Sequence, residues 1–240
     1  MEYLYIFDLV GTFAFSVYGA YIGLQKKFDY VGVSICALLC SMGGGTIREV
    51  FLNRTPFYFY DHTYIYVMFA GVLFSSIMYN QFHRINKGML VLDAIGLSTF
   101  AFVGAAKGIE ANLGFVGAVF FALLTAVGGG VLRDILVNDT PSTFLQRDFY
   151  ATPAILSGAL HYIFRSSMND TIAIFSLLAL IFALRIIAIF FPYYFTDLIS
   201  KILRAGIPQK IFAHTKSAEQ VRRALLKTSV PQDLTSSRKN

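Results

Sequence analysis

One sequence pattern occurs twice in this chain and constrains its fold more than any other feature. In residues 43–56 (GGGTIREVFLNRTP) and 128–141 (GGGVLRDILVNDTP), three glycines end an apolar run, and an arginine, an acid and Asn-x-Thr-Pro follow. Each glycine in a helix costs about 1 kcal/mol relative to alanine. We therefore interpret both copies as membrane helices broken at their glycines. Unwound backbone at membrane depth needs surrounding protein or a wet cavity, so the pattern predicts a polar path where the two breaks meet.

The composition is that of a membrane protein. Of the 240 residues, 56% are hydrophobic and 14% are charged, whereas soluble domains are about 45–50% apolar and about 25% charged. Seven apolar segments have close to the roughly 20 residues of a spanning helix. The N-terminal residues lack the basic region of a cleaved signal peptide, so they are interpreted as the first span. The predicted spans are 3–24, 30–53, 62–79, 88–108, 114–138, 149–164 and 171–194. The expected fold class is an all-α polytopic membrane protein with seven transmembrane helices.

The two halves of the chain align without a gap at one constant shift. Asp8 pairs with Asp93, a shift of 85 residues (93 − 8), and the same shift carries both glycine triplets and both Asn-x-Thr-Pro segments onto one another. Each copy holds three spans, and because three is odd, the second copy enters the membrane from the opposite side. In such inverted repeats, polar solute sites lie near the midplane on discontinuous helices. The predicted units are 1–87 and 88–168 for the repeats, 169–199 for the seventh helix and 200–240 for a basic tail.

Basic residues in the loops predict the orientation. The tail holds most of them, and placing the N-terminus outside puts the tail in the cytoplasm. The inner loops then hold Lys26, Lys27, Arg84, Lys87 and Arg147, and the outer loops hold Arg54, Lys107 and Arg165. We interpret the tail as a segment beside anionic membrane lipid rather than as a nucleic-acid binder.

Two arginines follow the glycines by one helical turn. A lone arginine in a membrane costs at least about 2.5–3.5 kcal/mol, so Arg48 and Arg133 need partners or water. The neighbouring acids Glu49 and Asp134 do not face them on a helix. We therefore expect each arginine to meet an acid across the repeat interface. The alternative is that all four residues lie at the membrane surface.

Two further acids lie near the starts of spans 1 and 4. Asp8 and Asp93 are either interfacial charges or residues that line the path. With Glu49 and Asp134 they make four acids against two arginines, and this excess favours cations if all six side chains face one cavity. We expect free carbonyls at the breaks Gly43, Gly44, Gly45, Gly128, Gly129 and Gly130, together with the hydroxyls of Ser41 and Thr125, to replace part of an ion's hydration shell.

Nothing in the sequence indicates an enzyme or a metal centre. Neither glycine run continues into the Gly-Lys-Ser/Thr of a phosphate-binding loop, and no Ser–His–Asp or Cys–His arrangement is recognisable. Cys36 and Cys40 are interpreted as packing residues. Arg185 in span 7 either reaches the interface, pairs with an acid or faces a neighbouring subunit. No cofactor is expected.

The doubled GGG-x-x-R-[DE] motif in a three-plus-three-plus-one arrangement resembles a known family. Over residues 3–195 the chain is similar to prokaryotic relatives of the trimeric intracellular cation (TRIC) channels, and to bacterial UPF0126 membrane proteins described as glycine transporters. The resemblance implies a homotrimer in the prokaryotic plasma (inner) membrane with one pore in each protomer. It also implies that the glycines of spans 2 and 5 kink those helices around the pore, beside Arg48 and Arg133. The animal channels carry a lysine-containing pattern after the first glycines, where this chain has Arg48 and Glu49.

The leading hypothesis is a passive channel for monovalent cations, K⁺ above all and Na⁺ second, and lipid is a candidate bound ligand. The alternative is a secondary transporter of glycine or another small zwitterion. A third class, a receptor or assembly protein, would act through the tail.

Overall fold

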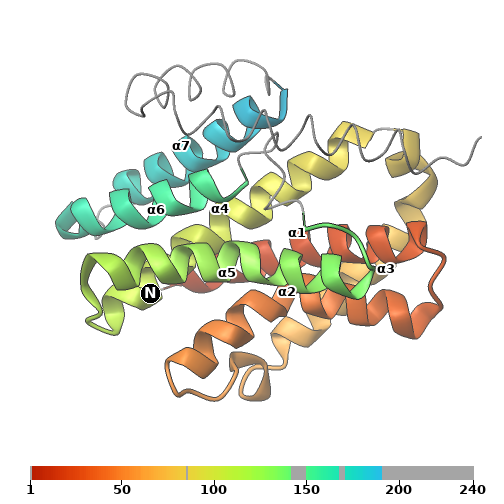
Figure 1. Ribbon diagram of the computed structural model, residues 1–240, viewed down its shortest axis with the longest axis horizontal. Helices are drawn as coiled ribbons and strands as arrows, with labels where there is room; N and C mark the ends of the chain where they lie inside the picture. Colours follow the sequence, from red (N-terminus) through yellow and green to blue (C-terminus); the bar gives the residue numbers. More distant parts are fainter. Residues whose placement is uncertain (1, 85, 142–149, 168–170, 191–240) are drawn as a thin grey trace, which may run out of the picture. The chain divides into compact units, whose positions relative to one another are not determined.

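The computed structural model describes residues 2–84, 86–141, 150–167 and 171–190 (Figure 1). The predictions for Arg147 and for the basic tail at 200–240, including its place beside lipid, concern residues outside these ranges.

Within these ranges all regular secondary structure is helical, as predicted. Six of the seven α-helices are long and apolar enough to cross a membrane. The exception, α6, has 13 residues, which rise only about 20 Å against the roughly 30 Å of a hydrocarbon core. The helices are α1 (Glu2–Gln25), α2 (Tyr30–Phe51), α3 (Thr63–Arg84), α4 (Asn86–Glu110), α5 (Gly114–Leu136), α6 (Ala151–Ile163) and α7 (Thr171–Phe190), with short 3-10 helices η1 (Phe57–Phe59) and η3 (Arg165–Ser167).

The repeat is also present in the backbone conformation of the loops. Four described residues other than glycine have positive φ: Lys27 (59°), Asn53 (53°), Asn112 (57°) and Asn138 (56°). The shift that relates Asp8 to Asp93 also relates Lys27 to Asn112 and Asn53 to Asn138. Asn53 follows the C-cap residue of α2, and Asn138 follows the C-cap residue of α5. The asparagine of Asn-x-Thr-Pro is therefore a helix stop, because asparagine tolerates the left-handed conformation that ends many helices.

The helices α1, α2, α4 and α5 form the centre of the helical part of the chain (Figure 1). The contact of α1 with α2 corresponds to that of α4 with α5, whereas α1 with α4 and α2 with α5 join the two halves. Phe15 of α1 and its equivalent Phe100 of α4 pack edge to face, with ring centroids 5.2 Å apart. Gly11 and Gly96 make room for these rings. Helix α3 packs on α1, α6 on α4 and α5, and α7 on α4 and α6.

The predicted breaks at the glycine triplets are absent. Helix α2 continues through residues 43–45 and α5 continues through residues 128–130. The glycines serve close packing instead: a Cβ on Gly44 would overlap the carbonyl oxygen of Thr125, and one on Gly129 would overlap that of Cys40. The expectation of free helix carbonyls at these positions is therefore wrong, since small residues here allow two intact backbones to touch.

Candidate functional site

The third glycine of each triplet lies beside a guanidinium group. A Cβ built on Gly45 would overlap the Phe57 ring and lie 3.9 Å from Nη2 of Arg48, and one on Gly130 would lie 3.9 Å from Nη2 of Arg133. Both arginines are almost fully buried, with exposed fractions of 1% and 2%. Both arginines lie in the last turn of their helices, α2 and α5, so the alternative of a position at the membrane surface stays a prediction.

Each arginine pairs with the acid that follows it in the sequence. Nε and Nη2 of Arg48 lie 2.8 and 2.7 Å from Oε1 of Glu49. Nε and Nη2 of Arg133 lie 2.8 and 2.6 Å from Oδ1 of Asp134. The prediction of acid partners across the repeat interface is wrong for these pairs. Adjacent helical residues point apart at Cβ, but arginine has a long stem and a planar fork that can turn back onto a neighbouring carboxylate.

Arg133 does reach the other half of the molecule, through a thiol and a ring. Its Nη1 donates to Sγ of Cys40 on α2 at 3.3 Å, and its guanidinium lies 4.6 Å from the ring centroid of Tyr18 on α1. Cys40 is thus a polar contact of the arginine as well as a packing residue. The guanidinium of Arg48 lies 5.9 Å from the ring centroid of Phe57.

Asp8 and Asp93 are each bound by a tyrosine from the third helical segment of their own half. The Tyr64 hydroxyl donates to Oδ2 of Asp8 at 3.1 Å, and the Tyr150 hydroxyl donates to Oδ1 of Asp93 at 2.6 Å. The sequence comparison missed these tyrosines because their separations from the acids are 56 and 57 residues, so a constant shift does not align them.

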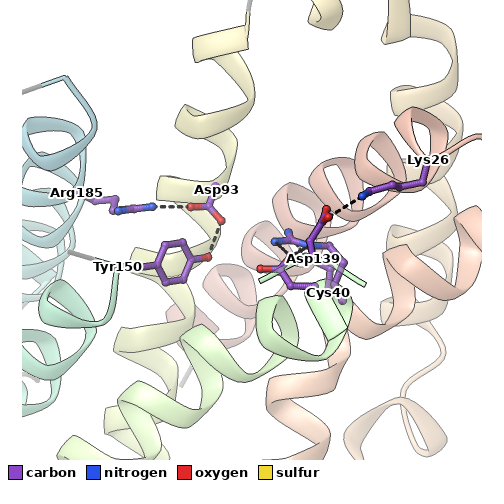
Figure 2. A network of polar contacts seen from close by, with 8 residues as sticks. Lys26, Cys40, Asp93, Asp139, Tyr150 and Arg185 are labelled. Atoms are coloured by element: carbon purple, nitrogen blue, oxygen red, sulfur yellow. Dashed lines mark hydrogen bonds and ion pairs between the residues drawn. The ribbon is translucent and has the colours of Figure 1, made fainter. Parts of the chain in front are cut away.

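One difference between the two halves comes from α7. Nη2 of Arg185 lies 3.2 Å from Oδ2 of Asp93, and the guanidinium lies 4.4 Å from the ring centroid of Tyr150. Figure 2 shows Arg185 of α7 and Tyr150, which directly precedes α6, converging on the Asp93 carboxylate. Among the three alternatives for Arg185, the structure therefore selects pairing with an acid.

Two cavities adjoin these carboxylates. The first has a volume of about 560 Å³, and we call it the outer vestibule after the predicted orientation, in which the N-terminus lies outside. The second, the inner vestibule, has a volume of about 90 Å³. The outer vestibule is lined by Asp8, Arg48, Glu49, Asn53, Arg54, Thr55, Phe57, Tyr60, Tyr64 and Lys107. The inner vestibule is lined by Tyr18, Leu90, Asp93, Tyr150, Arg185, Ala188 and Ile189.

The vestibules lie near opposite ends of α4. Lys107 lines the outer vestibule and Asp93 lines the inner one. Their separation along one helix corresponds to a rise of about 21 Å. Three of the predicted site residues, Asp8, Arg48 and Glu49, therefore share a cavity, while Asp93 lies in a separate one.

The glycine triplets and the two predicted hydroxyl ligands lie at the crossing of α2 and α5. The Ser41 hydroxyl donates to the carbonyl of Ala37 at 2.7 Å. The hydroxyl of Thr125 is buried without a hydrogen-bond partner among the described residues, and the carbonyl of the same residue faces Gly44.

Comparison with known proteins places this arrangement in a family. The model of the family described as "Glycine transporter" matches residues 5–80 and 90–166. The chain belongs to this family. The two matches begin at positions related by the same shift as Asp8 and Asp93, so the family unit is the three-helix repeat. The resemblance deduced from the doubled motif is thereby confirmed.

Similar proteins include bacterial UPF0126 membrane proteins. A UPF0126 membrane protein of Deinococcus radiodurans is 36% identical over 155 residues, covering 64% of this chain and 72% of that protein. The UPF0126 inner membrane protein YadS of Escherichia coli K12 is 35% identical over 160 residues, covering 66% of this chain and 77% of that protein. The chain is accordingly an integral membrane protein.

Solved structures of similar fold are TRIC channels. A prokaryotic TRIC channel crystallised in 0.5 M KCl has a TM-score of 0.74 and 29% identity, covering 80% of this chain and 98% of that one. The TRIC trimeric intracellular cation channel orthologue from Rhodobacter sphaeroides has a TM-score of 0.72 and 29% identity, covering 79% and 98%. These neighbours are ion channels rather than enzymes.

Proposed function

We propose that this protein is a channel for monovalent cations, permeable to K⁺ and secondarily to Na⁺, with a path through each protomer of a homotrimer. The observation that carries the proposal is a buried carboxylate bound by a tyrosine hydroxyl near each end of α4, in a fold shared with TRIC cation channels. Carboxylates lining a pore favour cations over anions. The trimer is inferred from the trimeric neighbour.

The path would run from the outer vestibule past the crossing of α2 and α5 to the inner vestibule. At that crossing the two backbones touch through Gly44 and Gly129, so conduction requires these helices to separate or slide. Because glycine has no side chain beyond a hydrogen atom, these positions offer no interlocking side chains that would oppose such a movement. Arg48 and Arg133 lie one turn beyond the crossing on either helix, where their charges would set the barrier for a cation.

The predicted orientation, with the N-terminus outside, would open the outer vestibule to the exterior and the inner vestibule to the cytoplasm. The exposed apolar residues of α3 and α7, such as Leu73, Ile77 and Ile172, offer surfaces to lipid or to neighbouring protomers.

The test is electrical recording from the purified protein in planar bilayers of varied lipid composition. Single-channel K⁺ currents that persist with Na⁺ and vanish with a large organic cation would support the proposal. Protein shown to be folded and trimeric that passes no current under any lipid condition would overturn it.

A transporter of a small zwitterion is the second candidate, and the outer vestibule favours it. This cavity combines two acids, Asp8 and Glu49, with three bases, Arg48, Arg54 and Lys107. Nη1 of Arg48 is buried without a hydrogen-bond partner among the described residues, and it could bind a carboxylate. Uptake of labelled glycine into proteoliposomes separates the two functions, because a carrier saturates and is competed by unlabelled glycine, whereas a cation channel does neither.

A further inference from the structure

The internal repeat allows the surroundings of Asp93 to be compared with those of Asp8. Both carboxylates accept a hydrogen bond from a tyrosine and adjoin a cavity. The difference is the guanidinium of Arg185, which contacts the Asp93 carboxylate and lies against the Tyr150 ring (Figure 2). Helix α7 lies outside the two matched segments, so Arg185 belongs to neither repeat.

The buried charges of the two halves differ accordingly. Within the described part of the chain, Asp8, Glu49 and Arg48 leave the first half with one excess negative charge. The second half would have the same excess from Asp93, Asp134 and Arg133, but Arg185 balances it. Arg185 is only 3% exposed and its partner Asp93 only 1%. The cavities also differ in volume, which is about 90 Å³ beside Asp93 and about 560 Å³ beside Asp8, where the less buried bases Arg54 and Lys107 join the lining.

We propose that the carboxylate of Asp93, the hydroxyl of Tyr150 and the face of the Tyr150 ring form a second site for monovalent cations, and that Arg185 is a tethered cation occupying it. The ligand class is K⁺ or a small organic cation such as guanidinium. Carboxylate and phenol oxygens suit K⁺, and an aromatic face adds attraction for a planar organic cation. The effect of Arg185 on conduction rests on the proposed channel function. Cation binding by Asp93 and Tyr150 rests only on the geometry of these residues.

Conduction through the inner vestibule would then require Arg185 to leave Asp93 or to share the carboxylate with the passing ion. A guanidinium at this position lowers cation occupancy by charge repulsion and by filling the space. Removing its charge should therefore raise K⁺ current, whereas removing the Asp8 carboxylate should reduce it.

The binding test measures thermal unfolding of detergent-purified protein in the presence of millimolar guanidinium chloride, KCl or N-methylglucamine chloride at matched ionic strength. All variants carry Asp8→Asn, so that cation binding at the Asp8 carboxylate does not contribute to the shift in melting temperature. The parent protein in this comparison is Asp8→Asn with Arg185 intact. We expect Arg185→Ala to melt lower than its parent and to regain several degrees with guanidinium, and part of that with K⁺, since a ligand that binds only the folded state raises its stability. N-methylglucamine is too large for the site and should have no effect.

Two controls identify the site. The double variant Arg185→Ala with Asp93→Asn should lose the cation response, and Arg165→Ala, which alters an exposed arginine outside the vestibule, should behave as its parent. No selective response to guanidinium or K⁺ in Arg185→Ala, or a response that survives loss of Asp93, would overturn the proposal.

Electrical recording keeps the proposal testable if Arg185→Ala does not survive purification. Arg185→Gln retains much of the side-chain volume and should raise K⁺ conductance severalfold, whereas Arg185→Lys should stay close to the parent. If the wild type conducts and Arg185→Gln conducts no more, the inference fails while the channel stands. If no variant conducts yet Arg185→Ala binds guanidinium through Asp93, the channel fails while the cation site stands.

Discussion

Gly44 on α2 lies so close to Thr125 on α5 that a methyl group on the glycine would overlap the threonine's carbonyl oxygen. Gly129 has the equivalent relation to Cys40. The two contacts belong to a single crossing of intact helices that lies between the vestibules. The triplets therefore determine how closely α2 and α5 approach, rather than where they unwind.

Adding a methyl group at this crossing should destabilise the protein. We expect Gly44→Ala and Gly129→Ala to cost about 1–3 kcal/mol each, the usual range for overpacking a tight interface, because the obstacle is rigid backbone. Thermal unfolding in detergent measures the effect. Gly130→Ala is the matched control, since its Cβ would lie 3.6 Å from its nearest neighbour, the Tyr150 hydroxyl. Equal melting of all three variants would contradict the packing role.

The buried pair of Arg48 and Glu49 should show strong energetic coupling. Side-chain exposures of 2% and 8% mean that Arg48→Gln or Glu49→Gln leaves one buried charge without its main partner, which costs about 3–5 kcal/mol. The double variant should recover much of this loss, and a double-mutant cycle from denaturant unfolding measures the coupling.

The exposed pair of Lys107 and Glu110 provides the comparison, with side-chain exposures of 29% and 47%. Pairs at the surface contribute about 0–1 kcal/mol. A coupling for Arg48 and Glu49 no larger than that of the surface pair would show that the buried charges are well hydrated.

Loss of the Asp8 carboxylate should reduce cation current. In Asp8→Asn the outer vestibule keeps its shape but loses one of its two carboxylates, so K⁺ conductance at low salt should fall about tenfold, equivalent to about 1.4 kcal/mol in cation binding. The reduction should shrink at high salt, where screening weakens the field of the carboxylate. Asp139→Asn is the control, because it removes a carboxylate that is 51% exposed and pairs with Lys26. An equal loss of current in both variants would argue against a specific role for Asp8.

The helices and the repeat were predictable because both depend on local pattern. Apolar runs gave the spans, and one constant shift related Asp8 to Asp93. The consequence of the glycines was not predictable, because a glycine that weakens a helix and one that admits a neighbouring carbonyl look identical until the facing residue, here Thr125, is known.

The partners of the charged residues needed three-dimensional information for other reasons. Helical geometry at Cβ separates Arg48 from Glu49, and only the flexible arginine stem brings them together. Tyr150 escaped notice because the spacing of the tyrosines differs by one residue between the halves. Arg185 lies on the helix without a counterpart, so no alignment within the chain could assign it to Asp93.

The positive φ of the asparagines after α2 and α5 allows a final prediction about stability. Asn138 has φ 56° and Asn53 has φ 53°, a conformation that costs about 1–2 kcal/mol for residues other than glycine, with asparagine among the least penalised. Asn138→Gly should therefore be neutral or slightly stabilising, whereas Asn138→Val should destabilise by about 1–2 kcal/mol because a β-branched side chain is poorly tolerated there. The same ordering should hold at Asn53, since the repeat gives it the same role, and thermal unfolding of the four variants measures it. If valine were tolerated as well as glycine at both positions, the left-handed backbone turn would not be the reason for asparagine there.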